Sequence, residues 1–444
     1  MQSCKRVLSN GERGLSLYQF TFVITFIIIS LLACRGASRV KSASDFSLAD
    51  RSLPFTGVSW IIIGTIVGGV STVGTVQAAY SYGISACIFT FGSGISCFLL
   101  GCFFAKALRE EGVVTVSEYL GNYFGKRFQY YSSTFNSAGM FIHVVGQFLA
   151  SIAILQSVFH FGDISSVLIT TLLIGIFVVS GGISGAGLIG KIKFFMLYII
   201  MIASAWLALK KGGGMSEILA HLPVDSGMLD FSVYGVKSAA IDMFSMLVGV
   251  LSTQIYLQAI FSAKNVREAR NGAFLSAVLI PPIGVFGIII GLYLRANVPE
   301  LGANSAQALP YFLHHSFPKP VAALFSAGIL LIVLGTAAGL LLGVTTNLYN
   351  DFPLKNAAFL QRIQPVRLLR ITTFLVLISA SLLVLTGLDS TILSWSYMSM
   401  GLRGSAVFAG LVILVFMKKW HHSKLVLFLL YMLPLIYLAL NVSH

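Results

Sequence analysis

The chain has 444 residues, of which 57% are hydrophobic and only 10% are charged. Soluble domains carry about 25% charged residues, so this composition excludes an ordinary soluble protein and predicts one that is largely surrounded by lipid. The formal net charge of +14 does not indicate a nucleic-acid partner, because the basic residues gather in the connections on one side of the predicted membrane segments.

Apolar segments of the length that a membrane helix requires follow one another along the whole chain. A spanning helix needs about 20 mainly apolar residues, and about twelve segments meet this requirement. They cover roughly residues 17–36, 55–78, 83–106, 131–158, 163–180, 186–209, 235–260, 270–294, 318–345, 369–387, 390–417 and 424–442. Little sequence remains for a soluble domain. We therefore expect an all-α, multi-pass protein of a bacterial-type inner (plasma) membrane.

Lysine and arginine are unevenly divided between the connections. If the N-terminus lies outside, the inner connections hold most of them: Arg35, Arg39, Lys41, Arg51, Lys106, Arg109, Lys126, Arg127, Lys264, Arg267, Arg270, Lys355, Arg362, Arg367, Arg370, Lys418, Lys419 and Lys424. The outer connections hold fewer. This is the positive-inside asymmetry, and it predicts the orientation of the chain.

The first apolar segment has two interpretations. Lys5, Arg6 and Arg13 precede it and LLAC ends it at Cys34, a pattern that resembles a secretory signal with a lipoprotein cleavage site. Cleavage would require residues 35–53, with four basic residues, to cross the membrane. We therefore expect an uncleaved helix.

The predicted helices group as one, five, five and one. Two blocks with an odd number of helices have opposite orientations in the membrane, which is the usual way to build alternating access. The corresponding units are residues 1–54 (extra helix and inner loop), 55–209 (first five-helix repeat), 235–417 (second five-helix repeat) and 418–444 (C-terminal extra helix).

Two apolar segments at matching positions in these blocks are interrupted by small residues. Residues 64–72 read GTIVGGVST, and residues 245–254 read SMLVGVLSTQ. Lipid offers no hydrogen-bond partner to a broken helix, so a break is tolerated only where it lines a cavity or binds a ligand. One such segment is typical of close helix packing. Two in register favour a transport site between them.

Five stretches resemble the sodium:solute symporter family, which includes transporters of sugars, proline, pantothenate and sialic acid. They are FSLADRSLP with the glycine-rich segment after it, VVTVSEYLGNYFGKRF, TQIYLQAIFSAKNVREARNG, ALPYFLHHSFP and GTAAGLLLGVTTNLYND. The resemblance extends over about residues 45–417. It implies a LeuT-type fold with a five-plus-five inverted repeat and a substrate site near the middle of the membrane.

The resemblance also implies a cation site between the first and eighth core helices. The family's oxygen ligands correspond to Gly64 and Val67 in the first helix, and to Ile332, Gly335 and Thr336 in the eighth. Thr336 keeps a hydroxyl, whereas Gly335 has none where the family has serine. One of the five oxygens that would replace the hydration shell of Na⁺ is therefore missing.

The fifth core helix departs from the family as well. Gly190 stands where many members carry an acidic residue, and Lys193 stands in place of a glutamine, with Lys191 between them. A lysine ammonium beside the incomplete site is a candidate to replace the cation and to load and release a proton. The alternative is that Lys191 and Lys193 extend to the lipid headgroups.

Polar residues inside the predicted helices are candidates to contact a substrate. Asn136, His143 and Gln147 lie on one helical face of the fourth segment. Arg403, in the middle of the eleventh segment, must meet water, a carboxylate or the substrate, because an arginine does not discharge. Asp242 is a candidate structural partner of Arg403, a carboxylate-bearing solute is a second option, and a position in a water-filled vestibule is the third. The complete candidate substrate set is Gly69, Ser71, Thr72, Asn136, His143, Gln147, Gly249, Ser252 and Arg403.

The expected function is secondary active symport of a small organic solute by alternating access, coupled to Na⁺. Two alternatives remain open: proton-coupled or uncoupled transport with Lys191 or Lys193 in place of the cation, and a membrane solute sensor that works with a partner protein. Motifs of membrane enzymes such as HExxH and GxSxG do not occur in the predicted spans. We expect no catalytic activity and no cofactor beyond the coupling ion.

Overall fold

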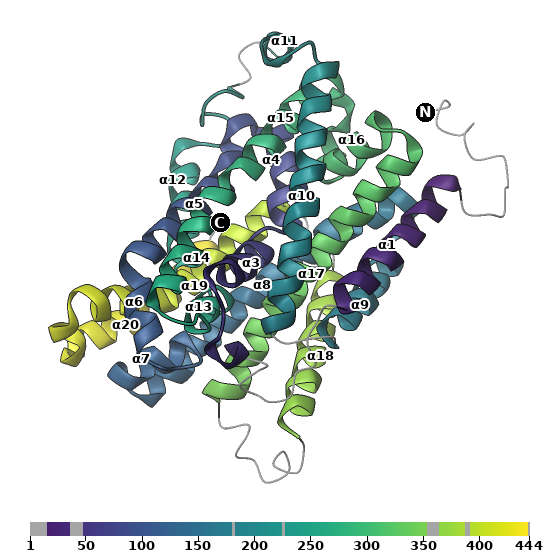
Figure 1. The fold of residues 1–444 in the computed structure, drawn as a ribbon. Coiled ribbons are helices and arrows are strands. Elements are labelled where there is room, and N and C mark those ends of the chain that lie inside the picture. The colour runs from purple at the N-terminus through teal and green to yellow at the C-terminus, as the bar shows by residue number, and fades with distance from the viewer. Residues whose placement is uncertain are drawn as a thin grey trace.

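Helices make up nearly all of the structure (Figure 1). The computed structural model describes residues 16–35, 48–179, 183–223, 227–352, 364–386 and 391–442. The first half contains α1 (Leu17–Arg35), η2 (Ala49–Arg51), α3 (Phe55–Ile66), η3 (Val70–Gly74), α4 (Thr75–Tyr82), η4 (Gly83–Ala86), α5 (Cys87–Leu99), η5 (Leu100–Phe104), α6 (Ala105–Glu110), α7 (Val116–Phe124), α8 (Lys126–Phe159), α9 (Asp163–Val179), α10 (Ile183–Lys211) and α11 (Met215–Ala220). The second half contains α12 (Val236–Val250), α13 (Gln254–Phe261), α14 (Val266–Leu279), α15 (Pro281–Asn297), η6 (Pro299–Gln307), α16 (Ala308–Ser316), α17 (Lys319–Asp351), α18 (Pro365–Val384), α19 (Ile392–Phe416), η9 (Lys418–His422) and α20 (Lys424–Val442).

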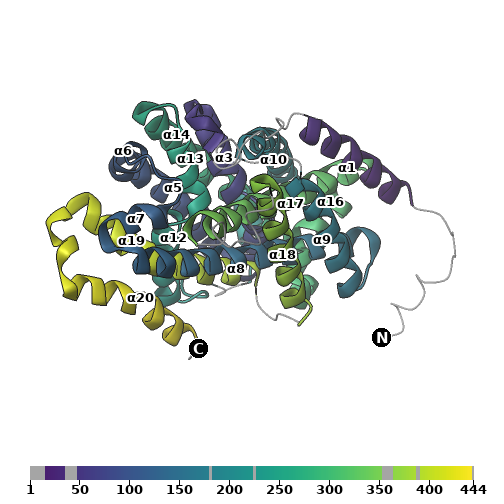
Figure 2. The same ribbon diagram turned by 90° about the horizontal axis from the view of Figure 1, so that it is seen from below.

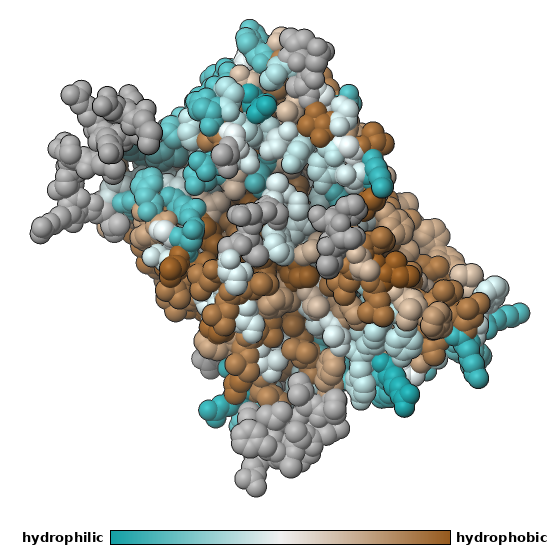
Figure 3. Space-filling model, turned by 180° about the vertical axis from the view of Figure 1, so that it is seen from behind, coloured by the Kyte–Doolittle hydropathy of each residue, from teal (hydrophilic) through white to brown (hydrophobic). Residues whose placement is uncertain are grey.

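The helices confirm a multi-pass membrane protein. Within the described ranges, eight helical stretches are long and apolar enough to cross a membrane, and four further apolar helices are shorter. Apolar residues form a belt across the molecule, and hydrophilic residues lie toward its two ends (Figure 3). The exact number of twelve spans stays a prediction.

Burial separates central helices from peripheral ones. In the most apolar 18-residue stretch of α17, 94% is buried, whereas in that of α18 only 33% is buried. Among the described helices, α8 packs most extensively against α19 and α17, so it lies among the central helices (Figure 2). Exposed apolar residues on α1, α9, α18 and α20 give these helices a surface that suits lipid.

The first core helix is broken where the glycine pair predicted a break. Its α3 portion ends at Ile66, and Val67 has an extended backbone with ψ of 100°. After the pair Gly68–Gly69 the chain re-enters a helix as η3 and α4. Glycine is needed beside this interruption because a side chain would collide with the neighbouring helices: a Cβ at Gly68 would lie 2.5 Å from Thr336 Oγ1, and one at Gly69 would lie 2.4 Å from Ala150 Cβ.

The second predicted break is also present. Helix α12 ends at Val250, and Thr253 has an extended backbone with φ of −75° and ψ of 120° before α13 begins. The hydroxyls of Ser252 and Thr253 donate to Val248 O and Gly249 O, which satisfies two carbonyl groups at the end of α12. Both members of the pair are thus interrupted within an apolar segment.

One buried carboxylate joins three elements at the inner side, as the basic residues orient the chain. Asp351, at the end of α17, accepts hydrogen bonds from Thr115 Oγ1 at 2.5 Å, Gln129 Nε2 at 3.0 Å and Ser133 Oγ at 2.6 Å. Thr115 is the N-cap of α7, where it accepts from the Glu118 amide. The Asp351 side chain thereby links the short helix α7 to both α8 and α17.

Candidate functional site

The break in the first core helix is stabilised by side chains from within and from α8. Gly68 N donates to Ser71 Oγ at 2.9 Å, and Thr72 Oγ1 donates to Gly68 O at 2.8 Å. Gly69 N donates to Gln147 Oε1 at 2.8 Å. These bonds satisfy backbone groups that have no helical partner at the break. Of the candidate substrate residues, Ser71 and Thr72 are therefore engaged in the turn itself.

Four of the five oxygens proposed for the cation converge between α3 and α17. The Thr336 hydroxyl oxygen lies 3.2 Å from Gly64 O, 3.2 Å from Val67 O and 3.0 Å from Ile332 O. The fifth position, Gly335, has no side-chain oxygen. Carbonyl and hydroxyl oxygens grouped in this way favour a hard cation or an ammonium group.

An ammonium group lies directly at these oxygens. Lys193 Nζ is 2.5 Å from Gly64 O and 2.6 Å from Thr336 Oγ1. Only 2% of the Lys193 residue is exposed. Lys191, two residues earlier on α10, is exposed and lies on the other side of the helix. The structure therefore separates the two candidate lysines that the sequence left together.

Two glycines bring Lys193 to this position. Helices α3 and α10 pack backbone to backbone at Gly64 and Gly190: a Cβ at Gly190 would lie 2.1 Å from Trp60 O, and a Cβ at Gly64 would lie 2.7 Å from Gly190 Cα. No side chain fits between the helices at such distances. The acidic residue that many family members carry at the Gly190 position has no room in this arrangement.

The polar stripe of α8, formed by Asn136, His143 and Gln147, contacts both broken helices. Gln147 binds the first break at Gly69, and Asn136 Nδ2 donates to Ser252 O in the second break at 2.5 Å. Gly249, just before that break, lies against Met400 of α19, where a Cβ would be 2.4 Å from Met400 Cβ. The stripe thus bridges the two interruptions.

Arg403 is completely buried between α8 and α19, with an exposed fraction of 0%. Its Nη2 lies 3.1 Å from His143 Nδ1 and donates to Ser399 Oγ at 2.9 Å, and its Nε donates to Ser399 O at 3.1 Å. The prediction that Asp242 pairs with Arg403 is wrong, because the Asp242 carboxylate accepts a hydrogen bond from Tyr234 instead. In the described ranges, no acidic residue forms an ion pair with Arg403.

Sequence reasoning missed the serines that hold this arginine. Ser396 and Ser399 precede Arg403 by seven and four residues, which places all three on one face of α19. Ser396 Oγ lies 3.5 Å from His143 Nδ1, and Ser399 Oγ also donates to Gly139 O at 2.5 Å. The same search for helical periodicity that found the α8 stripe would have found them.

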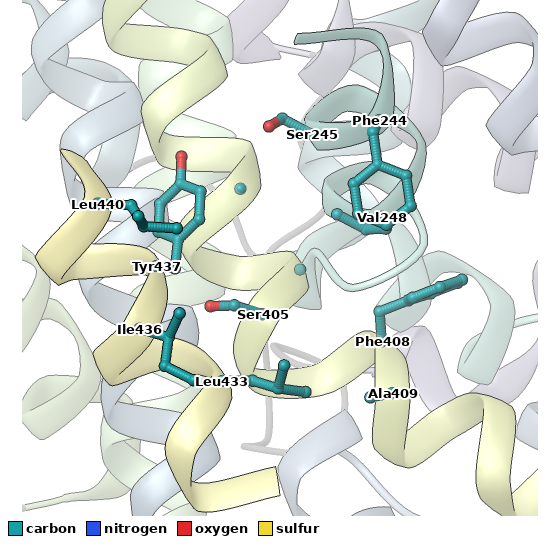
Figure 4. A pocket seen from close by; sticks show the side chains of 12 residues that line it. Phe244, Ser245, Val248, Ser405, Phe408, Ala409, Leu433, Ile436, Tyr437 and Leu440 are labelled. Atoms are coloured by element: carbon teal, nitrogen blue, oxygen red, sulfur yellow. The ribbon is translucent and has the colours of Figure 1, made fainter. Parts of the chain in front are cut away.

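A separate groove lies between α12, α19 and α20 (Figure 4). Phe244 and Val248 of α12, Phe408 of α19, and Leu433 and Ile436 of α20 line it. Its few polar groups include the Tyr437 hydroxyl, which donates to Met398 O. Such an apolar, partly open surface in the membrane belt suits lipid rather than a polar solute.

The fold and the site together define a membrane transporter: two apolar helices are interrupted, and buried polar groups connect the interruptions. A model of the sodium:solute symporter family matches residues 46–424. The chain belongs to this family.

Curated relatives are distant. A sodium/glucose cotransporter of Vibrio parahaemolyticus is 22% identical over 376 residues, which cover 76% of this chain and 69% of the relative. The high affinity choline transporter 1 of Homo sapiens is 24% identical over 426 residues, with 89% of this chain and 72% of the relative covered. The match to the choline transporter of Drosophila melanogaster covers 62% of this chain and less than half of the relative, 45%.

Solved structures show the same fold. A Na⁺-coupled sialic acid symporter in a substrate-bound outward-open state aligns with a TM-score of 0.76 at 16% sequence identity, covering 91% of this chain and 88% of that chain. A nucleobase-cation-symport-1 family transporter in a closed conformation aligns with a TM-score of 0.60 at 13% identity, covering 87% and 84%. These likenesses confirm the expected all-α fold of the LeuT type.

Proposed function

We propose that this chain is a secondary active transporter of the plasma membrane in which the ammonium group of Lys193 takes the place of the coupling cation. The solute is a small organic molecule bound between the two broken helices. Alternating access moves the site from one side of the membrane to the other. The contacts of Lys193 with Gly64 O and Thr336 Oγ1 carry this proposal.

Electrostatics opposes a sodium ion at the same oxygens. Two unit charges 4 Å apart repel each other by about 4 kcal/mol at an effective dielectric constant of about 20. A penalty of this size weakens cation binding by roughly a thousandfold. Na⁺ symport, the first expectation, requires Lys193 to leave Gly64 O and Thr336 Oγ1 or to lose its charge. The missing hydroxyl at Gly335 adds to the argument against Na⁺.

A lysine gives the transporter a means of coupling without a metal ion. The ammonium form bonds to α3 through Gly64 O and to α17 through Thr336 Oγ1, so it holds these two helices together from α10. The neutral amine has one donor fewer and no charge, and it holds them less strongly. Loss of the proton on one side and its return on the other would then accompany the movement of the solute.

The test is uptake of a solute panel into proteoliposomes with the Na⁺ and pH gradients imposed separately. We expect accumulation that depends on a pH gradient, or exchange that needs neither gradient, and no response to Na⁺. Accumulation driven by a Na⁺ gradient alone would contradict the lysine proposal. Solute binding without any uptake would instead favour the sensor that works with a partner protein.

A further inference from the structure

We propose that the solute is a small organic anion, a carboxylate without an ammonium group, held by Arg403 with His143 and Gln147. The inference rests on the proposed function, because it names the class of solute for the same site. All three side chains are completely buried, with exposed fractions of 0%. The solute therefore reaches them only after the surrounding helices have moved.

The protonation of His143 follows from its neighbour. An arginine has only hydrogen-bond donors, so His143 Nδ1 must accept the bond from Arg403 Nη2. In the neutral ring the proton then lies on Nε2. Nε2 is buried and has no hydrogen-bond partner among the described residues. His143 thus offers one unpaired N–H donor.

Gln147 also offers an unpaired N–H donor, because its other amide atom is already bonded. Its Oε1 accepts from Gly69 N at 2.8 Å, which fixes the amide so that Nε2 is the free end. In the part of the chain that the structure describes, this Nε2 is buried without a partner. Gln147 lies four residues after His143, on the same face of α8. Two unpaired donors therefore lie one helical turn apart.

Arg403 adds a third unpaired donor and a full charge. Its Nη1 is buried and makes no hydrogen bond to any described residue. The Tyr256 hydroxyl lies beside this guanidinium and attracts it, but not in the geometry of a normal hydrogen bond to Nη1. A buried donor without a partner costs about 1–3 kcal/mol, and more when it is charged. A ligand that supplies acceptors to this group recovers that free energy.

The unpaired groups select an acceptor. A carboxylate has two oxygens that only accept hydrogen bonds, and it pairs with arginine in a bidentate manner. One unpaired acceptor, Asn347 Oδ1, lies near Asn136. Asn136 precedes His143 by seven residues on α8, about 10 Å along the helix. The donors around Arg403 are thus separated from it.

The balance of buried charges excludes an amino acid. Three charged residues are buried within the described ranges: Lys193, Arg403 and Asp351. Asp351 is already held by Thr115, Gln129 and Ser133 at the inner end of α17. Among the residues that the structure describes, Lys193 and Arg403 are therefore both cations without an acidic partner. An anion compensates this charge, whereas the ammonium group of an amino acid would add to it.

Thermal unfolding of the purified full-length protein tests the proposal with matched probes. The probes are acetate, lactate and benzoate, each compared with its amide, and alanine as a zwitterion. We expect at least one carboxylate to raise the Tm of the wild type in a concentration-dependent way, whereas its amide and alanine leave the Tm unchanged. Arg403→Gln should weaken the apparent affinity for that carboxylate by at least tenfold, and Arg403→Lys should weaken it less.

Arg270→Gln serves as the matched control, because Arg270 is an exposed arginine whose Nε donates to Gly101 O at the inner side. It should bind the carboxylate as the wild type does. Equal stabilisation by the amide or by alanine, unchanged binding in Arg403→Gln, or no shift with any of the three carboxylates would overturn the proposal. The comparison of acid with amide uses the wild type, so it holds even if an Arg403 variant folds poorly. Na⁺-driven uptake of the same carboxylate would contradict the proposal for Lys193 but would agree with the proposal for Arg403.

Discussion

The ammonium nitrogen of Lys193 lies 2.6 Å from the hydroxyl oxygen of Thr336, on a different helix. A hydroxyl that accepts from an ammonium group directs its own hydrogen elsewhere, and Gly64 O, Val67 O and Ile332 O all lie within 3.2 Å of it. The Thr336 hydroxyl therefore links the ammonium group of Lys193 to the backbone oxygens at the broken end of α3. Hydrogen bonds from one lysine to a carbonyl and a hydroxyl oxygen thus connect α10, α17 and the interrupted helix.

Replacing Lys193 by glutamine removes the charge and keeps a side chain of similar length. We expect uptake to fall by at least tenfold, because charge-assisted hydrogen bonds to two partners are lost, each worth about 1.5–3 kcal/mol. Initial uptake rates in proteoliposomes measure this. Lys191→Gln is the control, since Lys191 is exposed on the same helix. Equal losses in both variants would show that the burial of Lys193 has no special role.

Thr336→Val keeps the shape of the side chain and removes the hydroxyl that bonds Lys193. We expect it to reduce uptake about as much as Lys193→Gln does, and the double variant to be no worse than either single one, because the two residues share one interaction. Thr336→Ser keeps the hydroxyl and should retain transport. Additive losses in the double variant would mean that the two side chains act independently.

Gly190→Ala should destabilise the protein, because the new methyl group would lie 2.1 Å from Trp60 O. Inserting a methyl group into a closely packed contact costs about 1–3 kcal/mol. Thermal unfolding in detergent measures the change. The control is Gly175→Ala in α9, where the new Cβ meets only Leu377 Cδ2 at 3.8 Å. A similar Tm for the two variants would indicate that α3 and α10 move apart without cost.

Asp351→Ala should loosen the inner end of α17. It leaves the donors of Thr115, Gln129 and Ser133 without their acceptor, at a cost of about 1–3 kcal/mol for each buried group that water does not reach. We expect a lower Tm and faster labelling of a cysteine placed in α7. Asp163→Ala tests the specificity of the effect, since Asp163 accepts a hydrogen bond from Gln156 at an exposed position. Unchanged labelling in Asp351→Ala would mean that other contacts hold α7.

Local sequence patterns predicted the two helix breaks and the shared polar face of α8. The glycine pair at Gly68 and the small residues around Gly249 predicted both breaks, because backbone flexibility is a property of the residues themselves. The spacing of Asn136, His143 and Gln147 predicted a shared face, because the helical period is fixed. Contacts between distant segments were less accessible: Asp242 looked like a partner of Arg403, and only packing shows that it binds Tyr234 instead.

The sequence by itself determined that this is a multi-pass membrane protein of the sodium:solute symporter family, with two helices that break. Composition, apolar length and local motifs suffice for that, since each acts over a few residues. Tertiary structure alone decided that Lys193 rather than Lys191 meets the oxygens of Gly64 and Thr336. That choice depends on how closely α10 approaches α3, which the contact of Gly190 with Trp60 O sets across more than a hundred residues of chain.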